Sequence, residues 1–280
     1  MVKSNKFVSI DAGATTTCFY SSSKIITRST RSLFDIKKRK MKNNCLEIFE
    51  ELKTKKIYMT GVLSDVIGEN QTLLKKINGE DMKIQYVSEI DSIAKGALSY
   101  INNRAENIET ALIASCGTGL CLVYFDKGKI THLGGSAICG GTLLGSLRLM
   151  LRRKIKIEEL KKYTPENYNH SMDYVLNDFT KQTIGMLPPD TTFSNFANVS
   201  YYPKEQSEEE IICSVLNLVS ENIVSTASLA IKNTPAKNII FTGNVIRFPF
   251  VESVIKKYLT DFNLYFVKDC AVVARGCLIS

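Results

Sequence analysis

Short apolar segments alternate with stretches of helical periodicity along the chain, and this alternation predicts an α/β fold. The first half begins with a strand, a glycine turn and a second strand, expected at residues 6–10, 11–14 and 15–21. A short helix at 46–52 and strands at 56–60 and 84–87 follow. From position 89 to 100 the spacing i, i+3, i+4, i+7, i+8 predicts a helix, through Ile90, Ile93, Ala94, Ala97 and Leu98. Glu89 is therefore expected in the first turn of that helix.

The second half repeats this opening about 104 residues later. We expect a strand at 110–114, a glycine turn at 115–119, and a return strand at 120–126 that is extended at 129–132. A glycine-rich loop at 134–142 leads into a helix at 143–151, for which Thr142 is the expected N-cap. Helices at 208–232 and 250–259 then alternate with strands at 238–242 and 263–267, and a last helix starts at Ala271. The repetition predicts two lobes, 1–109 and 110–280, with one shared pattern.

The composition excludes several classes of protein. Hydrophobic residues make up 44% of the 280 positions, yet no apolar run approaches the ~20 residues of a bilayer span. The first residues lead directly into a strand and lack the charged, apolar and small-residue succession of a signal peptide. Eight cysteines without a CxxC pair are expected as reduced thiols rather than a disulfide framework or a zinc ribbon. We therefore expect a cytoplasmic protein that neither spans a membrane nor is secreted.

The positive charge does not by itself identify a partner. Lysine and arginine number 36 against 28 acidic residues, which gives a net charge of +8. Much of this charge lies in two runs, at 37–42 and 148–156, without interleaved aromatic residues for base stacking. We interpret both runs as solvated surface, with steering of a phosphorylated ligand as the alternative. No nucleic-acid partner is expected.

The two hairpin turns carry the candidate chemistry. A turn with glycine at its tip leaves backbone N–H groups pointing into one concavity, where phosphate oxygens bind. One such turn alone is well explained as a plain hairpin, but two matched turns with flanking hydroxyl or acidic side chains predict a site for the phosphates of a nucleotide. Two more loops fit, Gly140-Gly141-Thr142 with free N–H groups at an expected helix N-terminus, and Thr242-Gly243-Asn244 after a strand. Neither a P-loop nor a GxGxxG motif in a βαβ context is present.

Two carboxylates lie beside these turns in the predicted fold. Asp11 ends the first strand, where it would either hold Mg²⁺ together with phosphate oxygens or merely cap the turn. Glu89 begins a helix, where an acidic residue is often only a favourable partner for the helix dipole. The sharper hypothesis makes Glu89 a general base for a hydroxyl group that attacks the γ-phosphoryl group of ATP. The two histidines, His132 and His170, have no acid at ligand spacing, so we expect no zinc site.

Six segments in collinear order resemble the type II pantothenate kinases, which belong to the superfamily of acetate and sugar kinases, heat-shock chaperone ATPases and actin. They are IDAGATTT (10–17), SEIDSIAKGAL (88–98), SCGTGLCLVYFD (115–126), HLGGSAICGGTLLG (132–145), SNFANV (194–199) and FTGNVIR (241–247). The resemblance covers nearly the whole chain, although the first motif alone marks only the superfamily. It implies a duplicated ribonuclease-H-like fold with a nucleotide cleft between two lobes. It also implies a homodimer that uses ATP to phosphorylate the primary hydroxyl of pantothenate, the first step of coenzyme A biosynthesis.

Carried over position by position, the resemblance makes Glu89 the catalytic base and Asp11 the partner of Mg²⁺. It also assigns ATP binding to the loops, through Asp11, Gly13, Ala14, Thr15, Thr16, Gly117, Thr118, Gly119, Gly140, Gly141, Thr142, Gly243 and Asn244. Cys121 and His132 stand at the positions expected to hold pantothenate. The resemblance leaves open whether CoA thioesters inhibit the enzyme.

The chain departs from the family pattern at positions that bear on both substrates. Ala14 replaces the second glycine of the first turn, which a negative φ would tolerate, and Cys139 replaces the first glycine of a Gly-Gly-Gly-Thr run. Cys121 replaces a serine and His132 an arginine, and a neutral imidazole cannot reproduce the bidentate fork of arginine. Another hydroxylated acceptor, such as an amino sugar, therefore stays open. A nucleotide-binding regulator without catalysis, and an iron–sulfur ATPase that activates a radical dehydratase, are the remaining alternatives.

Overall fold

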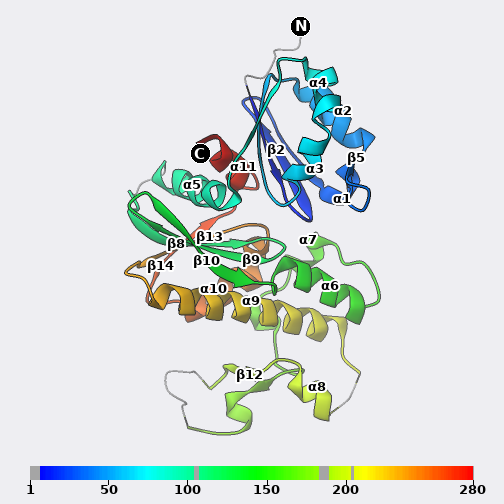
Figure 1. The fold of residues 1–280 in the computed structure, drawn as a ribbon. Coiled ribbons are helices and arrows are strands. Elements are labelled where there is room, and N and C mark those ends of the chain that lie inside the picture. The colour runs from blue at the N-terminus through cyan, green and yellow to red at the C-terminus, as the bar shows by residue number, and fades with distance from the viewer. Residues whose placement is uncertain (1–6, 104–106, 183–188, 203–204, 280) are drawn as a thin grey trace.

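The two halves of the chain fold into two five-stranded sheets with the same strand order (Figure 1). The structure is a computed structural model that describes residues 7–103, 107–182, 189–202 and 205–279. In each sheet the first strand is antiparallel to the second and parallel to the fourth, so the order β3-β2-β1-β6-β7 corresponds to β10-β9-β8-β13-β14. The α/β fold and the internal duplication predicted from the sequence are both confirmed.

The N-terminal sheet consists of β1 (Val8–Ala12), β2 (Thr16–Ser21), β3 (Ile25–Ser29), β6 (Lys56–Thr60) and β7 (Lys83–Tyr86). Residue Lys6, where we expected the first strand to begin, lies outside the described residues. One face of the sheet packs against α2 (Asn43–Leu52), α3 (Ser64–Glu69) and α4 (Gln71–Asn78). The pieces α1 (Thr30–Leu33), β4 (Phe34–Asp35) and β5 (Lys40–Met41) follow β3. The sequence did not predict them, because two to four residues are too few to show a periodic pattern.

The C-terminal sheet consists of β8 (Thr110–Cys116), β9 (Leu120–Asp126), β10 (Lys129–Ser136), β13 (Asn238–Thr242) and β14 (Asn263–Val267). One of its faces packs against α6 (Gly140–Met150), α9 (Glu208–Lys232) and α10 (Pro249–Tyr258) in the largest core of the molecule. Among the described residues, α9 alone is long and apolar enough to cross a membrane by length and composition. Of the 18-residue apolar stretch of this helix, 61% is buried inside the protein, because its apolar side chains form the centre of this core.

A smaller unit lies between α6 and α9 and projects beyond α9 (Figure 1). It contains β11 (Tyr174–Val175), β12 (Thr192–Ser194) and α8 (Ala197–Tyr201), together with a 3-10 turn at Leu176–Asp178. Helix α7 (Ile157–Leu160) lies next to α6 and buries Leu160 in the core of the C-terminal sheet, and a 3-10 turn at Pro165–Asn167 follows it (Figure 1). The buried carboxylate of Asp173 holds this unit together, because it accepts hydrogen bonds from the hydroxyl of Tyr168 and from the backbone N–H of Phe196.

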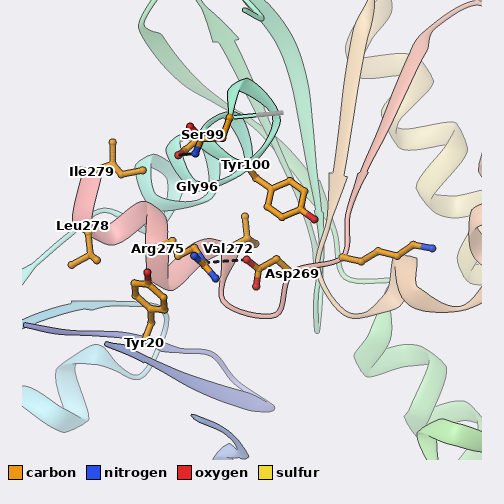
Figure 2. Close-up of a pocket in the computed structure, with 11 residues that line it drawn as sticks. Tyr20, Gly96, Ser99, Tyr100, Asp269, Val272, Arg275, Leu278 and Ile279 are labelled. Carbon is orange, nitrogen blue, oxygen red and sulfur yellow. Dashed lines mark hydrogen bonds and ion pairs between the residues drawn. The ribbon is translucent and has the colours of Figure 1, made fainter. Parts of the chain in front are cut away.

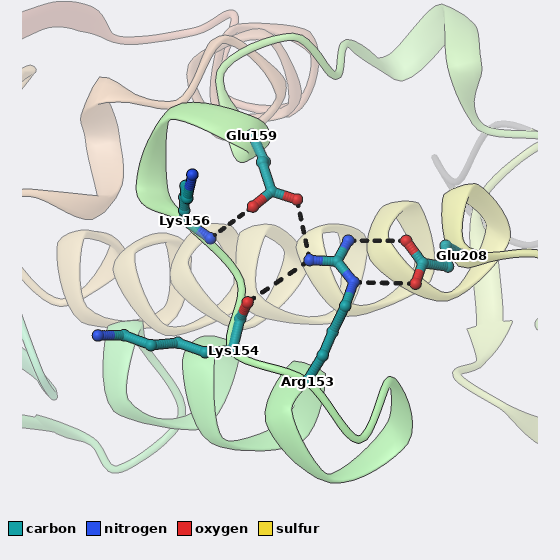
Figure 3. Close-up of polar contacts among 5 residues, drawn as sticks. All are labelled: Arg153, Lys154, Lys156, Glu159 and Glu208. Carbon is teal, nitrogen blue, oxygen red and sulfur yellow. Dashed lines mark hydrogen bonds and ion pairs between the residues drawn. The ribbon is translucent and has the colours of Figure 1, made fainter.

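Arg153 joins the segment after α6 to the start of α9 (Figure 3). Its Nε and Nη2 donate to the carboxylate of Glu208 at 2.9 and 2.7 Å, and its Nη1 donates to Glu159 at 3.0 Å. We had interpreted the basic run at 148–156 as solvated, with steering of a phosphorylated ligand as the alternative. Arg153 itself is half-exposed, and its ion pairs with Glu159 and Glu208 leave it little free charge with which to steer a phosphorylated ligand.

The last helix of each half crosses to the sheet of the other half. Helix α5 (Glu89–Asn102) packs on the free face of the C-terminal sheet, whereas α11 (Val272–Ile279) packs against β1, β2 and β6. Where the two helices cross, a Cβ on Gly96 would lie 2.1 Å from the carbonyl oxygen of Val272, and one on Gly276 would lie 1.9 Å from that of Ser92. The glycines therefore let the two backbones touch. The predicted division at residues 109 and 110 separates the sheets, but these helices connect them.

Candidate active site

The tips of the two glycine turns meet between the lobes. The first turn joins β1 to β2 and the second joins β8 to β9, which are the corresponding strands of the two sheets. The hydroxyl oxygens of Thr15 and Thr118 lie 3.0 Å apart and share a hydrogen bond, although 103 residues separate them in the chain. The tips of the two turns are therefore in direct contact, which the prediction of a paired phosphate site requires.

The third loop supports the second turn instead of presenting free N–H groups. The amides of Gly140 and Gly141 donate to the carbonyl oxygens of Gly117 and Thr118 at 3.0 and 2.8 Å. A Cβ on Gly140 would lie 2.5 Å from the oxygen of Gly117, so only glycine allows this approach. Our expectation of free N–H groups at 140 and 141 is therefore wrong.

These hydrogen bonds also change the start of helix α6. The helix begins at Gly140 with Cys139 as its N-cap residue, so the prediction of Thr142 as N-cap is wrong as well. The neighbouring turn accepts the first two amides of the helix, and no side-chain cap is needed. The hydroxyl of Thr142 donates instead to the carbonyl of Ala137 at 3.0 Å.

The fourth loop packs directly behind the second turn. Gly243 has a φ of 99°, and a Cβ there would lie 2.4 Å from the carbonyl oxygen of Cys116. The corresponding residue of the first lobe is Gly61, with a φ of 90°, where a Cβ would lie 2.8 Å from the carbonyl group of Ala12. We did not identify Gly61 as a site-building residue, although a Thr-Gly pair ends both β6 and β13 and could have shown it.

Ala14 lies in the first turn without backbone strain. Ala14 is exposed and is not among the six non-glycine residues with positive φ in the described chain, so its methyl group causes no backbone strain. The amide of Gly117 donates to the carbonyl oxygen of Gly119 at 3.0 Å and closes the second turn. Thr16 pairs with Ser29 in the sheet, and Asn244 is exposed at the mouth of the fourth loop.

Asp11 and Glu89 are close enough for the charge of Glu89 to affect the pKa of Asp11. Burial, and next the charge of Glu89, raise the pKa of Asp11 from 3.8 to about 7. Burial also raises the pKa of Glu89, even though Glu89 is the first residue of α5, where the helix dipole favours a negative charge. Among the residues that the structure describes, no lysine or arginine forms an ion pair with either carboxylate, and a carboxylate in such surroundings attracts a metal ion or a proton.

Asp11 fits the chemistry of a Mg²⁺ partner. The described residues contain no cluster of three or more His, Cys, Asp or Glu side chains that would enclose a metal ion. Mg²⁺ needs no such cluster, because it usually binds through one or two carboxylates, several waters and substrate phosphates. A single poorly solvated carboxylate beside two glycine turns meets that requirement.

Cys121 lies on the side of β9 that faces Glu89. Burial and the Glu89 charge raise the pKa of the Cys121 thiol to about 11, so the thiol stays protonated. In the β9–β10 pairing Cys121 lies opposite Gly135, and His132 lies opposite Val123, which is buried beneath α5. Residues opposite each other in an antiparallel pair point to the same face, so Cys121 and His132 both lie on the α5 face of the sheet.

A cavity of about 650 Å³ lies beside the crossing of α5 and α11, away from these residues (Figure 2). Arg275 is one of the residues that line this cavity. Its guanidinium lies 4.7 Å from the ring centroid of Tyr20, and its Nε lies 3.0 Å from the carboxylate of Asp269. None of the predicted site residues lines this cavity.

Comparisons with known proteins show the family and the fold of this chain. The family model described as Fumble matches residues 47–262. A type II pantothenate kinase of Staphylococcus haemolyticus is 26% identical over 77% of this chain and 79% of its own length, and one of Staphylococcus aureus is 23% identical over 96% and 91%. The crystal structure of the activator of 2-hydroxyisocaproyl-CoA dehydratase from Clostridium difficile with bound ADPNP superimposes with a TM-score of 0.59, at 14% identity over 97% of this chain and 92% of that one. This last likeness shows the fold alone.

Proposed function

This chain belongs to the Fumble family of type II pantothenate kinases, and we propose that it transfers the γ-phosphoryl group of ATP to the primary hydroxyl of pantothenate. Its family makes it an ATP-dependent kinase. The observation that carries the proposed mechanism is the meeting of the two glycine turns at Thr15 and Thr118. At that point the backbone N–H groups and hydroxyls of both lobes would surround one triphosphate.

We propose that nucleotide binding replaces the hydrogen bond between Thr15 and Thr118. Each hydroxyl would then donate to a phosphate oxygen, and a hydrogen bond to a charged acceptor is stronger than one between two hydroxyls. Mg²⁺ held at Asp11 would neutralise the negative charge that develops on the phosphates. In this proposal Gly140 and Gly141 do not contact the nucleotide directly but hold the second turn in position through their hydrogen bonds to it. Gly243 and Asn244 would lie on the adenosine side.

Glu89 serves as the base in this proposal. Its carboxylate accepts the proton of the attacking hydroxyl while the oxygen forms its bond to the γ-phosphorus and ADP leaves. Burial raises the pKa of Glu89 above its usual value, which makes its carboxylate a stronger proton acceptor. The proposal also includes the homodimer and the cytoplasmic location implied by the sequence. Feedback by CoA thioesters stays open, and acetyl-CoA added to the assay below would test it.

An iron–sulfur activator of a dehydratase fits this chain poorly. A cluster shared across a dimer needs two accessible thiolates from each chain. All eight cysteines lie in the described residues, and only Cys270 is exposed, Cys121 is half-buried, and the other six are buried. The likeness to a dehydratase activator therefore concerns the fold and not the cluster.

Transfer of radiolabelled phosphate from Mg-ATP to pantothenate, with a panel of sugars and amino sugars in parallel, tests the proposal. We expect Glu89→Gln to lower kcat by about 10²- to 10⁴-fold without weakening ATP binding, because only the proton acceptor is lost. Asp91→Asn, which changes the other acidic residue of the same helical turn, is the matched control and should keep its activity. Transfer to a sugar alone would favour the alternative kinase, and ATP binding without transfer to any acceptor would favour the regulator.

A further inference from the structure

Thr30, the first residue of helix α1, holds the first glycine turn from both of its sides. Its backbone N–H donates to the carbonyl oxygen of Thr15 at 2.9 Å, and its hydroxyl donates to the carbonyl oxygen of Gly13 at 2.7 Å. The residue is fully buried. It follows strand β3 and lies outside the segments from which we predicted the phosphate site, so the sequence did not point to it.

The hydroxyl of Thr17 orients the hydroxyl of Thr30. Their oxygens lie 3.0 Å apart, and both residues are buried. A hydroxyl group has one proton to donate, and that of Thr30 goes to Gly13. The Thr30 oxygen can therefore only accept from Thr17. The hydrogen bonds run from Thr17 through Thr30 to Gly13, and they fix the direction in which the Thr30 hydroxyl points.

The bond to Gly13 also sets the direction of the next amide group. The described chain contains no cis peptide bond, and in a trans peptide the C=O of one residue and the N–H of the next point in opposite directions. Because Thr30 holds the carbonyl of Gly13, the N–H of the exposed Ala14 points away from Thr30. Among the described residues, the amides of Gly13, Ala14 and Thr15 donate no hydrogen bond, so they are available to phosphate oxygens.

The second turn is held in a corresponding way, but by backbone groups alone. The carbonyl oxygens of Gly117 and Thr118 accept from the amides of Gly140 and Gly141, the first two residues of α6. Helix α6 follows the third strand of its sheet, β10, as α1 follows the third strand of the other sheet, β3. In each lobe the helix after the third strand therefore binds the carbonyls of the glycine turn. Only the first lobe uses a side chain for this, and a substitution can remove it.

We infer that Thr30 is a positioning residue for the nucleotide, which does not touch the phosphates but holds the amides of the first turn in the direction that binds them. This inference rests on the proposed nucleotide site. Without the hydroxyl, the carbonyl of Gly13 loses its donor, and the peptide group between Gly13 and Ala14 turns towards another partner. The N–H of Ala14 then leaves its position, and nucleotide affinity falls while the binding of the acceptor does not change.

Calorimetric binding of a non-hydrolysable ATP analogue with Mg²⁺ to the purified full-length chain tests the inference. We expect Thr30→Val, which keeps the shape of the side chain and removes the hydroxyl, to raise Kd about tenfold. Thr30→Ser keeps the donor and should bind within about threefold of the wild type. In the kinase assay Thr30→Val should raise KM for Mg-ATP about tenfold and change KM for pantothenate less than about twofold.

Thr54→Val is the matched control. Thr54 is a buried threonine of the same lobe, and its hydroxyl donates to the carbonyl oxygen of Lys56 at 3.1 Å. Strand β6 begins at Lys56 and pairs with Asp11 at its other end, through Thr60, so Thr54 lies far along the sheet from the first turn. Thr54→Val should lower the Tm as Thr30→Val does, and it should leave Kd for the analogue unchanged.

The outcomes distinguish this inference from the function on which it rests. A folded Thr30→Val variant that binds the analogue as tightly as the wild type would overturn the inference and keep the kinase. Equal weakening in Thr54→Val would show a loss of stability alone and would overturn it as well. No binding to the wild type would remove both the nucleotide site and the inference.

Amide hydrogen exchange of the wild type gives an answer even where Thr30→Val does not fold. In the nucleotide-free protein we expect the Thr30 amide to exchange slowly, because it is bonded to Thr15, and the amides of Gly13 and Ala14 to exchange fast until the analogue binds. Fast exchange at Thr30, or no protection of Gly13 and Ala14 by the bound analogue, would overturn the inference.

Discussion

Replacing Asp11 with asparagine measures how much the burial of an unpaired carboxylate between the lobes lowers the stability of the folded protein. The pKa of Asp11 is raised from 3.8 to about 7, so the folded protein holds this proton more tightly than the unfolded chain does. The stabilisation that comes from this proton is fully present below pH 3.8 and is lost as the pH rises through 7. At about 1.4 kcal/mol per pKa unit, a rise of roughly three units corresponds to about 4 kcal/mol. Partial solvent access at Asp11 reduces this value to about 2 kcal/mol.

Thermal melting of the nucleotide-free protein at pH 4, 6 and 8 provides the assay. We expect Asp11→Asn to melt about 4–6 °C above the wild type at pH 8 and close to it at pH 4, since the variant has no charge to bury. Added Mg²⁺ should raise the Tm of the wild type at pH 8 and not that of the variant. Asp261→Asn, which changes an exposed carboxylate, is the control and should follow the wild type. A Tm difference between Asp11→Asn and the wild type that stays constant from pH 4 to pH 8 would refute the reasoning.

Three further variants test the packing and the turns. Gly276→Ala places a methyl group against the backbone of α5 and should lower the Tm by several degrees, about 2 kcal/mol, whereas Gly145→Ala, a helical glycine with open space around it, should be neutral or stabilising in the same melt. Thr118→Val removes a hydroxyl from the meeting point of the turns, and we expect about a tenfold rise in KM for ATP with little change for the acceptor; an unchanged KM would exclude a phosphate contact. Arg153→Ala should lower the Tm, and the deficit should shrink in 1 M NaCl because salt screens ion pairs.

The periodic elements of this protein could be predicted from the sequence because their information is local. The helix expected at 208–232 spans Glu208–Lys232, and both hairpins lie within a few residues of their predicted bounds. Strand β3 and the pieces after it, helices α3 and α4, and the unit between α6 and α9 were missed. Most of these are too short or too polar to show a period, but the amphipathic pattern of α4 was there to be found. The error at Thr142 has a different cause. A neighbouring turn caps helix α6, and no residue inside the helix carries that information.

The sequence alone therefore determined the longer periodic elements, the duplication and the residue types that the chemistry needs, since each depends on neighbours along the chain. The tertiary structure decided which of these residues meet. Thr15 reaches Thr118, and Asp11 senses the charge of Glu89, only because α5 and α11 cross at Gly96 and Gly276 and set one sheet against the other. Contacts between residues so far apart in the chain depend on how the two lobes pack, and no local pattern records that packing.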